Sequence, residues 1–330
     1  MNRNESLWVL QQVVFLGLMV FVTGCAKKIP EPLRIGINAW PGSEFLYLAQ
    51  EKGFYQELGV AVKLVEFNAL ADARRAYERG QIDGLGTSII DVLQSREQST
   101  RAPQVVQVID YSNGADVIIA KSSVKNGAAL RGKKIGVELG SLGTYVLARG
   151  LEKFGLTLAD VQLISMDQIS MEEAINNGSL DAIVTYPPKS INIISQGKAT
   201  KIFDTAEIPG EVVDVIAIDD QVIQQRSVEV SNFLKAYQKA LHFTEQNPIE
   251  AYHIMAAREG ISADEFRAAL QAGMHVVTQA EQGEFFKAGG KLASVIDTSD
   301  RILRQSLQIK GPDRREGIVN ALFVEQDAQQ

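Results

Sequence analysis

Cysteine and histidine are scarce in this chain of 330 residues, which contains one cysteine and three histidines. A lone cysteine cannot form an intrachain disulfide, and it excludes zinc sites built from several cysteines. His242, His253 and His275 lie too far apart in the sequence to form a metal-binding motif. We interpret the three histidines as helix residues, and we predict no metal site, no cofactor and no catalytic residues.

Excess positive charge and long apolar runs are also lacking. Lysine and arginine number 33 against 40 aspartates and glutamates, a formal net charge of −7. Because nucleic-acid binding needs clustered cations, we exclude a nucleic-acid partner. The uninterrupted apolar run, Val13 to Val22, has ten residues. It is too short to span a bilayer and is typical of the apolar region of a secretory signal peptide.

What the chain does have is a cysteine at the end of that run, in Val22-Thr23-Gly24-Cys25. This segment resembles a bacterial lipobox, which implies cleavage before Cys25 and acylation of that residue, palmitate included. Several acyl chains give stable membrane anchoring. We therefore predict a lipoprotein signal peptide and lipidated cysteine in residues 1–25 and a flexible tether in residues 26–32. The alternative is an ordinary buried cysteine in an uncleaved helix.

Strand and helix signals alternate from Leu33 onward, which predicts an α/β fold with parallel sheets. The pattern occurs twice. Gly80-Gln81-Ile82-Asp83-Gly84 is echoed 98 residues later by Gly178-Ser179-Leu180-Asp181-Ala182, and Ile35-Gly36-Ile37 is echoed by Ile135-Gly136-Val137. Two copies in the same order predict two lobes of similar build. We interpret Asp83 and Asp181, which follow a glycine at a helix end, as structural residues.

The chain is expected to cross between the lobes twice. We assign residues 33–121 and 212–330 to the first lobe and residues 122–211 to the second. From Val228 onward the sequence is strongly helical without a strand signal, which predicts a helical cover on the first lobe. Two lobes joined in this way form a hinged clamshell, and ligands of such sheets lie beyond the carboxyl ends of the strands.

Several segments of the body resemble the periplasmic solute-binding proteins of ABC importers, in particular the nitrate, sulfonate, taurine and thiamine-precursor group. They are Trp40-Pro41-Gly42, Leu46 to Phe54, Gly80 to Asp83, Asp110 to Asp116, Leu130 to Val137, Leu180 to Pro187 and Pro248 to Tyr252. The resemblance implies a type II binding-protein topology, a periplasmic location and an ABC permease as partner. It does not specify the ligand.

Candidate ligand contacts follow strands at the expected cleft. Trp40 and Gly42 lie where the first strand gives way to a loop, and Tyr186 follows a later strand, where it can face Trp40. Thr87 and Ser88 begin a helix in the first lobe, and Ser141 and Thr144 begin one in the second. Free amides at such helix starts bind anions, although the same residues are also ordinary helix caps.

A second group of candidates is acidic. Asp110, Ser112 and Asp116 lie where the resemblance places the hinge and cleft floor, and Asp214 lies on the returning strand. Each aspartate can receive a ligand amine, or can instead cap a turn or form a hinge salt bridge. Because the predicted rim has few cations, with Lys189 the nearest, the ligand is expected to be sulfonate-like or taurine-like, or else aminopyrimidine-like, rather than nitrate.

These residues predict a monomeric extracytoplasmic lipoprotein that captures a small polar solute and delivers it to an ABC importer. One alternative is a sensor that presents its closed form to an inner-membrane receptor, since the same fold serves both roles. The other is an enzyme resembling a pyrimidine synthase. No histidine or cysteine cluster and no nucleophile motif supports catalysis, so we expect the protein not to be an enzyme.

Overall fold

The computed structural model describes residues 31–197 and 199–327, and Pro32–Gln330 is one compact unit. The predicted signal peptide, Cys25 and residues 26–30 of the tether lie outside the described residues. Within the described part, no helix combines the length and apolarity that a bilayer crossing requires.

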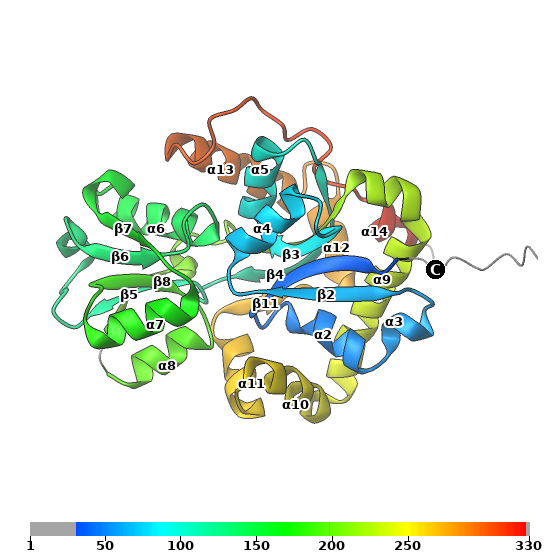
Figure 1. Cartoon of the computed structure of the whole chain (residues 1–330), viewed down its shortest axis with the longest axis horizontal. Coiled ribbons are helices and arrows are strands. Elements are labelled where there is room, and N and C mark those ends of the chain that lie inside the picture. The colour runs from blue at the N-terminus through cyan, green and yellow to red at the C-terminus, as the bar shows by residue number, and fades with distance from the viewer. Residues whose placement is uncertain (1–30, 198, 328–330) are drawn as a thin grey trace, which may run out of the picture. The chain divides into compact units, whose positions relative to one another are not determined.

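Two sheets organise the unit (Figure 1). The six-stranded sheet has the order β11-β4-β10-β3-β1-β2, and the five-stranded sheet has the order β7-β6-β8-β5-β9. The first comprises β1 (Leu33–Asn38), β2 (Val62–Phe67), β3 (Gly84–Ser88), β4 (Pro103–Ser112), β10 (Val213–Asp219) and β11 (Met274–Val276). The second comprises β5 (Val117–Lys121), β6 (Lys134–Val137), β7 (Gln162–Ser165), β8 (Ala182–Thr185) and β9 (Ala199–Asp204). We call each sheet with its helices the first and second lobe.

We predicted parallel sheets, but both sheets contain parallel and antiparallel pairs. β1 pairs in parallel with β2 and β3, and β6 with β7 and β8. However, β10 runs antiparallel to β3 and β4, and β5 runs antiparallel to β8 and β9. β5 is the strand that follows the crossing from the first lobe to the second, and β10 is the strand that follows the return crossing. A strand that enters from the other lobe arrives without a crossover helix, so it is not constrained to run parallel.

The first crossing between the sheets comes earlier than the predicted boundary between residues 121 and 122. β4 ends at Ser112 in the six-stranded sheet, and β5 begins at Val117 in the five-stranded sheet. Residues 113–116 therefore connect the sheets, and β5 belongs to the second. The boundary was misplaced because β4 and β5 are both buried apolar strands, which do not reveal the sheet they join. The return boundary at residues 211 and 212 stays a prediction.

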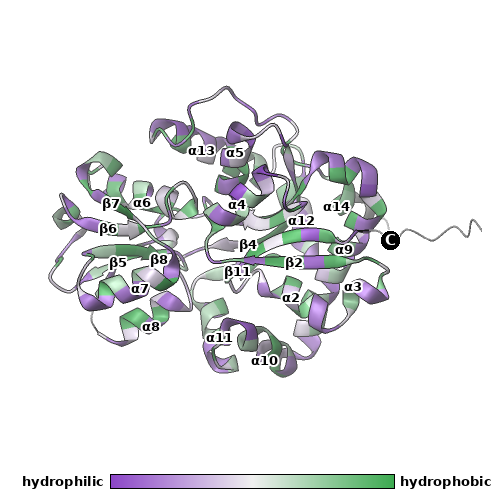
Figure 2. Cartoon of the chain, viewed as in Figure 1, coloured by the Kyte–Doolittle hydropathy of each residue, from purple (hydrophilic) through white to green (hydrophobic). Residues whose placement is uncertain are grey.

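The helices flank the sheets, with hydrophilic and hydrophobic residues on different sides of several of them (Figure 2). In the first lobe these are α2 (Glu44–Glu51), α3 (Phe54–Glu57), α4 (Leu70–Glu78) and α5 (Ile89–Gln98). In the second lobe they are η1 (Gly127–Leu130), α6 (Leu142–Lys153), η2 (Leu158–Asp160), α7 (Gln168–Asn177), α8 (Lys189–Ser195) and η3 (Thr205–Glu207).

The C-terminal region covers the first lobe, as predicted. It comprises α9 (Asp220–Gln246), α10 (Pro248–Glu259), α11 (Ala263–Gln271), α12 (Gln279–Phe286), α13 (Lys291–Gln305) and α14 (Leu322–Asp327). α9 and α10 pack against α2, α13 packs against α5, and α12 contacts β4. These are all first-lobe elements, so the predicted clamshell with a helical C-terminal cover is confirmed.

One strand in this region was not predicted. β11 pairs antiparallel with β4, and His275 lies in it rather than on a helix, stacked on Tyr111 with 4.8 Å between ring centroids. His242 and His253 do lie on helices, in α9 and α10. Three residues are too few to show the alternation that reveals a strand in sequence.

The internal repeat corresponds to the same packing in both lobes. A Cβ added to Gly36 would come within 2.6 Å of the Ile82 side chain, and one added to Gly136 within 2.5 Å of the Leu180 side chain. The repeated glycine therefore makes room for the repeated aliphatic residue, which comes shortly before the neighbouring strand of the sheet, β3 or β8. This is the close approach that favours glycine inside a strand.

The repeated aspartates have matching roles as well. Oδ2 of Asp83 accepts the backbone N–H of Arg34 at 2.9 Å, and Oδ2 of Asp181 accepts that of Lys134 at 3.1 Å. The Asp83 carboxylate fixes the start of β1 in the first lobe, and the Asp181 carboxylate fixes the start of β6 in the second. Both are structural, as we predicted.

Candidate functional site

A cavity lies where the carboxyl ends of strands from both lobes meet. Its volume is about 20 Å³, which is room for about one water molecule. In this arrangement of the lobes, the cavity has no room for a larger molecule. The residues that line it are Asn38, Trp40, Ser43, Leu70, Gly86, Thr87, Asp116, Leu142, Tyr186 and Asp214. Half of these, Trp40, Thr87, Asp116, Tyr186 and Asp214, are among the predicted ligand contacts.

Two aromatic rings from different lobes meet at this cavity. Trp40 follows β1 and Tyr186 follows β8, and their ring centroids lie 5.5 Å apart with an interplanar angle of 83°. Asn38, the last residue of β1, donates from Nδ2 to the Tyr186 hydroxyl at 3.4 Å. The structure thus brings together the two aromatic residues that we expected to face each other, and it adds Asn38 to them.

Asp110 lies behind Trp40 and does not line the cavity. The indole N–H of Trp40 donates to Oδ2 of Asp110 at 2.9 Å, and both groups are buried. A Cβ added to Gly42 would lie 1.8 Å from this oxygen. Gly42 is therefore required for the close packing around the Trp40–Asp110 hydrogen bond, and it contributes space rather than a contact.

Asp110, Asp116 and Asp214 form a cluster of buried carboxyl groups, with residue exposures of 0%, 3% and 7%. Asp110 and Asp214 are directly opposite each other on β4 and β10. Burial raises the pKa of Asp110 to about 7 and that of Asp116 to about 6. Burial, and then repulsion by the other two carboxylates, raises the pKa of Asp214 well above its ordinary value. An Asp214 that keeps its proton donates a hydrogen bond to Asp110.

No lysine or arginine is among the described residues that line the cavity. One carboxylate oxygen of Asp116, Oδ2, is buried without a hydrogen-bond partner, as is Oγ1 of Thr87. Among the described residues, no group of three or more His, Cys, Asp or Glu side chains could hold a metal ion. The unpartnered oxygen of Asp116 can accept a hydrogen bond from a group that brings donors or positive charge.

Ser112 positions this cluster at the first crossing between the lobes. Its hydroxyl lies 2.6 Å from Oγ1 of Thr205 and accepts the backbone N–H of Asp116 at 3.1 Å. Ser112 is buried and does not line the cavity. Its contacts fix the backbone from which the Asp116 side chain enters the site.

Three other predicted contacts are engaged within the protein. Ser88 is the N-cap of α5, where it accepts the N–H of Asp91 at 3.2 Å and donates to Oδ2 of Asp91 at 2.7 Å. Thr144 donates to the carbonyl oxygen of Glu138 at 3.0 Å. Ser141 lies at the start of α6 and donates a long hydrogen bond, 3.5 Å, to Oδ2 of Asp91. None of the three lines the cavity.

Asp91 was not among the predicted site residues, although it is fully buried at the start of α5. Burial raises its pKa, while Arg74, Ser88, Ser141 and the backbone N–H of Leu142 act in the opposite direction. Its position one turn into a helix is that of an ordinary acidic residue near a helix N-terminus, so the sequence gives no signal of a contact with the other lobe.

Sequence reasoning also missed half of the cavity lining, namely Asn38, Ser43, Leu70, Gly86 and Leu142. Asn38 could have been found, because it is a polar residue at the end of a strand that leads into the cleft. Leu70 and Leu142 carry no such signal. They are ordinary first-turn helix residues, and only the approach of α4 and α6 places them at the site.

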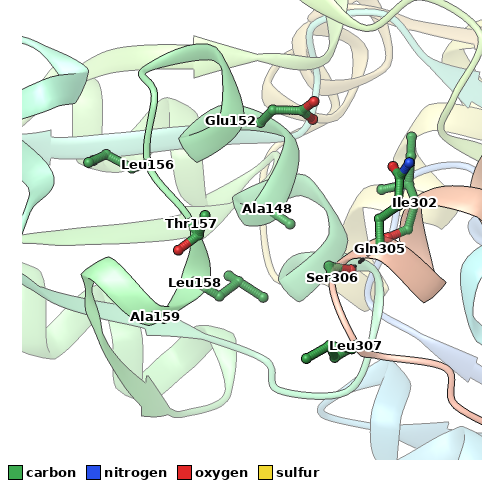
Figure 3. A pocket seen from close by; sticks show the side chains of 10 residues that line it. All are labelled: Ala148, Glu152, Leu156, Thr157, Leu158, Ala159, Ile302, Gln305, Ser306 and Leu307. Carbon is green, nitrogen blue, oxygen red and sulfur yellow. Dashed lines mark hydrogen bonds between the residues drawn. The ribbon is translucent and has the colours of Figure 1, made fainter.

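A larger cavity of about 460 Å³ lies between α6 and η2 of the second lobe and the end of α13 (Figure 3). Its lining combines apolar residues, among them Leu156, Leu158 and Ile302, with the polar residues Glu152, Thr157, Gln305 and Ser306. It contains none of the predicted site residues and no cluster of buried titratable groups. The small cavity, which gathers those groups, is therefore the better candidate for the functional site.

The NMT1/THI5-like family profile matches residues 40–251, which include all of the predicted ligand contacts. The chain is 22% identical over 241 residues to the taurine-binding periplasmic protein of Escherichia coli, covering 71% of this chain and 70% of that protein. It is also 22% identical over 234 residues to 4-amino-5-hydroxymethyl-2-methylpyrimidine phosphate synthase of Aspergillus parasiticus, covering 65% of this chain and 66% of the enzyme.

Among solved structures, the alkanesulfonate-binding protein SsuA of Xanthomonas axonopodis bound to MOPS matches with a TM-score of 0.74. The match has 18% identity and covers 88% of this chain and 98% of that protein. This similarity establishes a shared fold, which is that of the periplasmic binding proteins. Because the family profile matches well over half of the sequence, the chain belongs to the NMT1/THI5-like family.

Proposed function

We propose that this protein is an extracytoplasmic solute-binding lipoprotein that captures a small polar solute between its lobes and delivers it to an ABC importer. The binding-protein fold and the relationship to a periplasmic taurine-binding protein support the binding role. The apolar run that ends in Cys25 supports export to the periplasm and a lipid anchor there. In this proposal the partners are the solute, an ABC permease and the membrane, and the protein acts as a monomer.

The cluster of buried carboxyl groups is the observation on which we base the proposed class of solute. A buried carboxylate needs a hydrogen-bond donor or a positive charge, and the described lining of the cavity provides no lysine or arginine. A ligand nitrogen that donates to Asp116 and Asp214 would supply that hydrogen-bond donor or positive charge. Trp40 and Tyr186 would contact the ring or carbon skeleton, and Thr87 would donate to an acceptor. We therefore favour an aminopyrimidine-like solute over a simple sulfonate, with taurine intermediate because it carries an ammonium group.

The remaining predicted residues would support these contacts. Asp110 would hold the Trp40 ring, Gly42 would leave room for that hydrogen bond, and Ser112 would fix the backbone of Asp116. Asp110 would also share a proton with Asp214 and so adjust the charge of the cluster.

Isothermal titration calorimetry with three compounds tests this proposal. We expect saturable binding of 4-amino-5-hydroxymethyl-2-methylpyrimidine, weaker binding of taurine and none of ethanesulfonate. Tight binding of ethanesulfonate together with no binding of the pyrimidine would overturn the solute class. If no compound bound, the capture of small nitrogenous solutes would itself be wrong.

The two other functions have less support. A sensor would use the same cavity, so it differs only in its partner, and no described feature favours a receptor over a permease. An enzyme related to the pyrimidine synthase would need nucleophilic or acid–base groups at the site. Among the described residues that line the cavity, Asp116 and Asp214 can act as acids or bases, but no histidine or cysteine is present to act with them as a nucleophile. Incubation with the pyrimidine should therefore leave it chemically unchanged, which mass spectrometry can measure.

A further inference from the structure

At the cleft, a carboxylate of the first lobe lies at the N-terminus of a helix of the second. α6 begins after Ser141, whose side chain makes no capping hydrogen bond within its own helix. The Asp91 carboxylate, which belongs to α5, instead accepts the hydroxyl of Ser141 at 3.5 Å and lies near the backbone N–H of Leu142. The carboxylate thus provides a cap from the opposite lobe.

The reverse contact is present too. α4 of the first lobe begins after Ala69, which has no capping side chain, and Glu138 of the second lobe lies near the backbone N–H of Leu70. Gln168 holds the other side of this contact, donating from Nε2 to Oε1 of Glu138 at 3.1 Å. Each lobe therefore places a carboxylate on a helix start of the other lobe.

Arg74 joins the two contacts. From α4 it donates to the carbonyl oxygen of Gly140 at 3.0 Å, directly before α6. Its Nε lies 3.8 Å from Oδ1 of Asp91, and that oxygen is buried without a hydrogen-bond partner. Arg74 and Asp91 are both buried, with exposures of 3% and 0%. Water therefore screens these charges little, and separating the lobes would expose them.

The helix start that Asp91 occupies is one that would otherwise attract an anionic ligand. The first amides of a helix point outward and carry partial positive charge. The sequence predicts ligand contacts at Ser141 and Thr144, because free amides at a helix start bind anions. In the structure the carboxylate of Asp91 lies there, while Leu142 itself lines the cavity.

We infer that Asp91 is a specificity-determining residue that acts as a built-in anion, holding the lobes together at α6 and excluding anionic solutes from that helix start. The part of this inference that concerns selectivity rests on the proposed solute-binding function. Glu138 provides the corresponding contact at α4. Closure of the cleft over a solute then requires no negative charge on the solute, because the protein supplies it.

Removal of the carboxylate and its replacement by a small anion tests the inference. In the purified Asp91→Ala protein, the lobes are expected to separate more, which small-angle X-ray scattering detects as a larger radius of gyration without solute. Sodium formate, titrated at constant ionic strength, should bind in the vacated space and return the radius towards the parent value with saturation. The parent and the matched variant Asp72→Ala should not respond, since Asp72 is exposed on α4 and pairs with Arg75.

The same variant tests selectivity. Asp91→Ala should gain a saturable thermal shift with ethanesulfonate, and its affinity for the aminopyrimidine should fall at least tenfold and recover with formate. The inference would be overturned if Asp91→Ala had the radius of gyration of the parent and responded to neither formate nor ethanesulfonate. If Asp91→Ala does not fold, Asp91→Asn keeps the shape without the charge, and an unchanged radius in it would equally overturn the inference. Failure of the parent to bind any solute would refute the proposed function alone, because the formate response needs no solute.

Discussion

The indole N–H of Trp40 donates to Oδ2 of Asp110 at 2.9 Å, and Gly42 packs directly against this hydrogen bond. A Cβ at position 42 would lie 1.8 Å from the carboxylate oxygen and 2.8 Å from Nε1 of Trp40. One side chain therefore orients the aromatic wall of the cavity, and a glycine makes that orientation sterically allowed. Ring, carboxyl and backbone act here as a unit.

We expect Gly42→Ala to separate Trp40 from Asp110 and to leave both polar groups buried without partners. The overpacking and the lost hydrogen bond together should lower the free energy of unfolding by about 2–4 kcal/mol. Urea unfolding measures the change. Gly283→Ala is the control, because no atom beyond its chain neighbours and the nearby backbone of α12 lies within 4 Å of the added Cβ. Equal stability of both variants would show that the Trp40–Asp110 contact is not sterically constrained.

The pKa of Asp110, raised to about 7, makes stability depend on pH. Below its ordinary pKa near 4, Asp110 is protonated in both the folded and the unfolded protein. Between about pH 4 and pH 7 only the unfolded state ionises, so the contribution of Asp110 to folding stability falls as pH rises. Relative to Asp110→Asn, the parent should lose on the order of a few kcal/mol across this range. Urea unfolding of both proteins from pH 4 to 8 measures the difference, and a constant difference would contradict the assignment.

Asp116→Asn should weaken binding of the aminopyrimidine. A hydrogen bond to a charged group contributes about 1.5–3 kcal/mol, so we expect a loss of affinity of roughly 10- to 150-fold. Because burial raises the pKa of Asp116 to about 6, a cationic solute should also release protons when it binds near pH 6. Calorimetry in buffers of different ionisation enthalpy measures this release. Unchanged affinity and unchanged proton release in Asp116→Asn would place the ligand nitrogen elsewhere.

Trp40 should report solute binding by fluorescence. The chain has two tryptophans, Trp8 and Trp40, so a Trp8→Phe background leaves Trp40 as the sole indole emitter. Solute contact and lobe movement change the polarity around its ring, and the emission maximum should shift with saturation at the calorimetric affinity. Tyr186→Phe keeps the ring contact and should retain the shift. Tight binding without any emission change would show that Trp40 does not contact the solute.

Much of the fold follows from local patterns in the sequence. The repeated glycine, aliphatic and aspartate positions made the two lobes recognisable, because the same packing around Gly36 and Gly136 requires the same residues. The direction of β5 and β10 was not predictable, since a buried apolar strand looks the same whether its neighbours run with it or against it. β11 is too short to give a periodic signal at all.

The site was predictable to the extent that polar and aromatic residues follow strands. Trp40 and Tyr186 were identified in this way, Asp116 through the family resemblance and Asp214 by its place on the returning strand, and all four line one cavity. Leu70, Leu142 and Asp91 were not, because each is typical of a first helical turn and becomes part of the cleft only through contact with the other lobe. Interlobe contacts depend on the closed arrangement of two bodies, which no local pattern in one of them specifies.

The position of β10 has a consequence for the order in which the protein can fold as it is synthesised. β10 lies between β3 and β4, although the whole five-stranded sheet is encoded between β4 and β10. β3 and β4 therefore lack their common neighbour until residues 213–219 have left the ribosome. All strands of the second sheet have emerged by then. The five-stranded sheet can thus be completed before the six-stranded sheet, although the six-stranded sheet begins earlier in the sequence. This reverses the usual order of folding during translation, in which the N-terminal domain folds first.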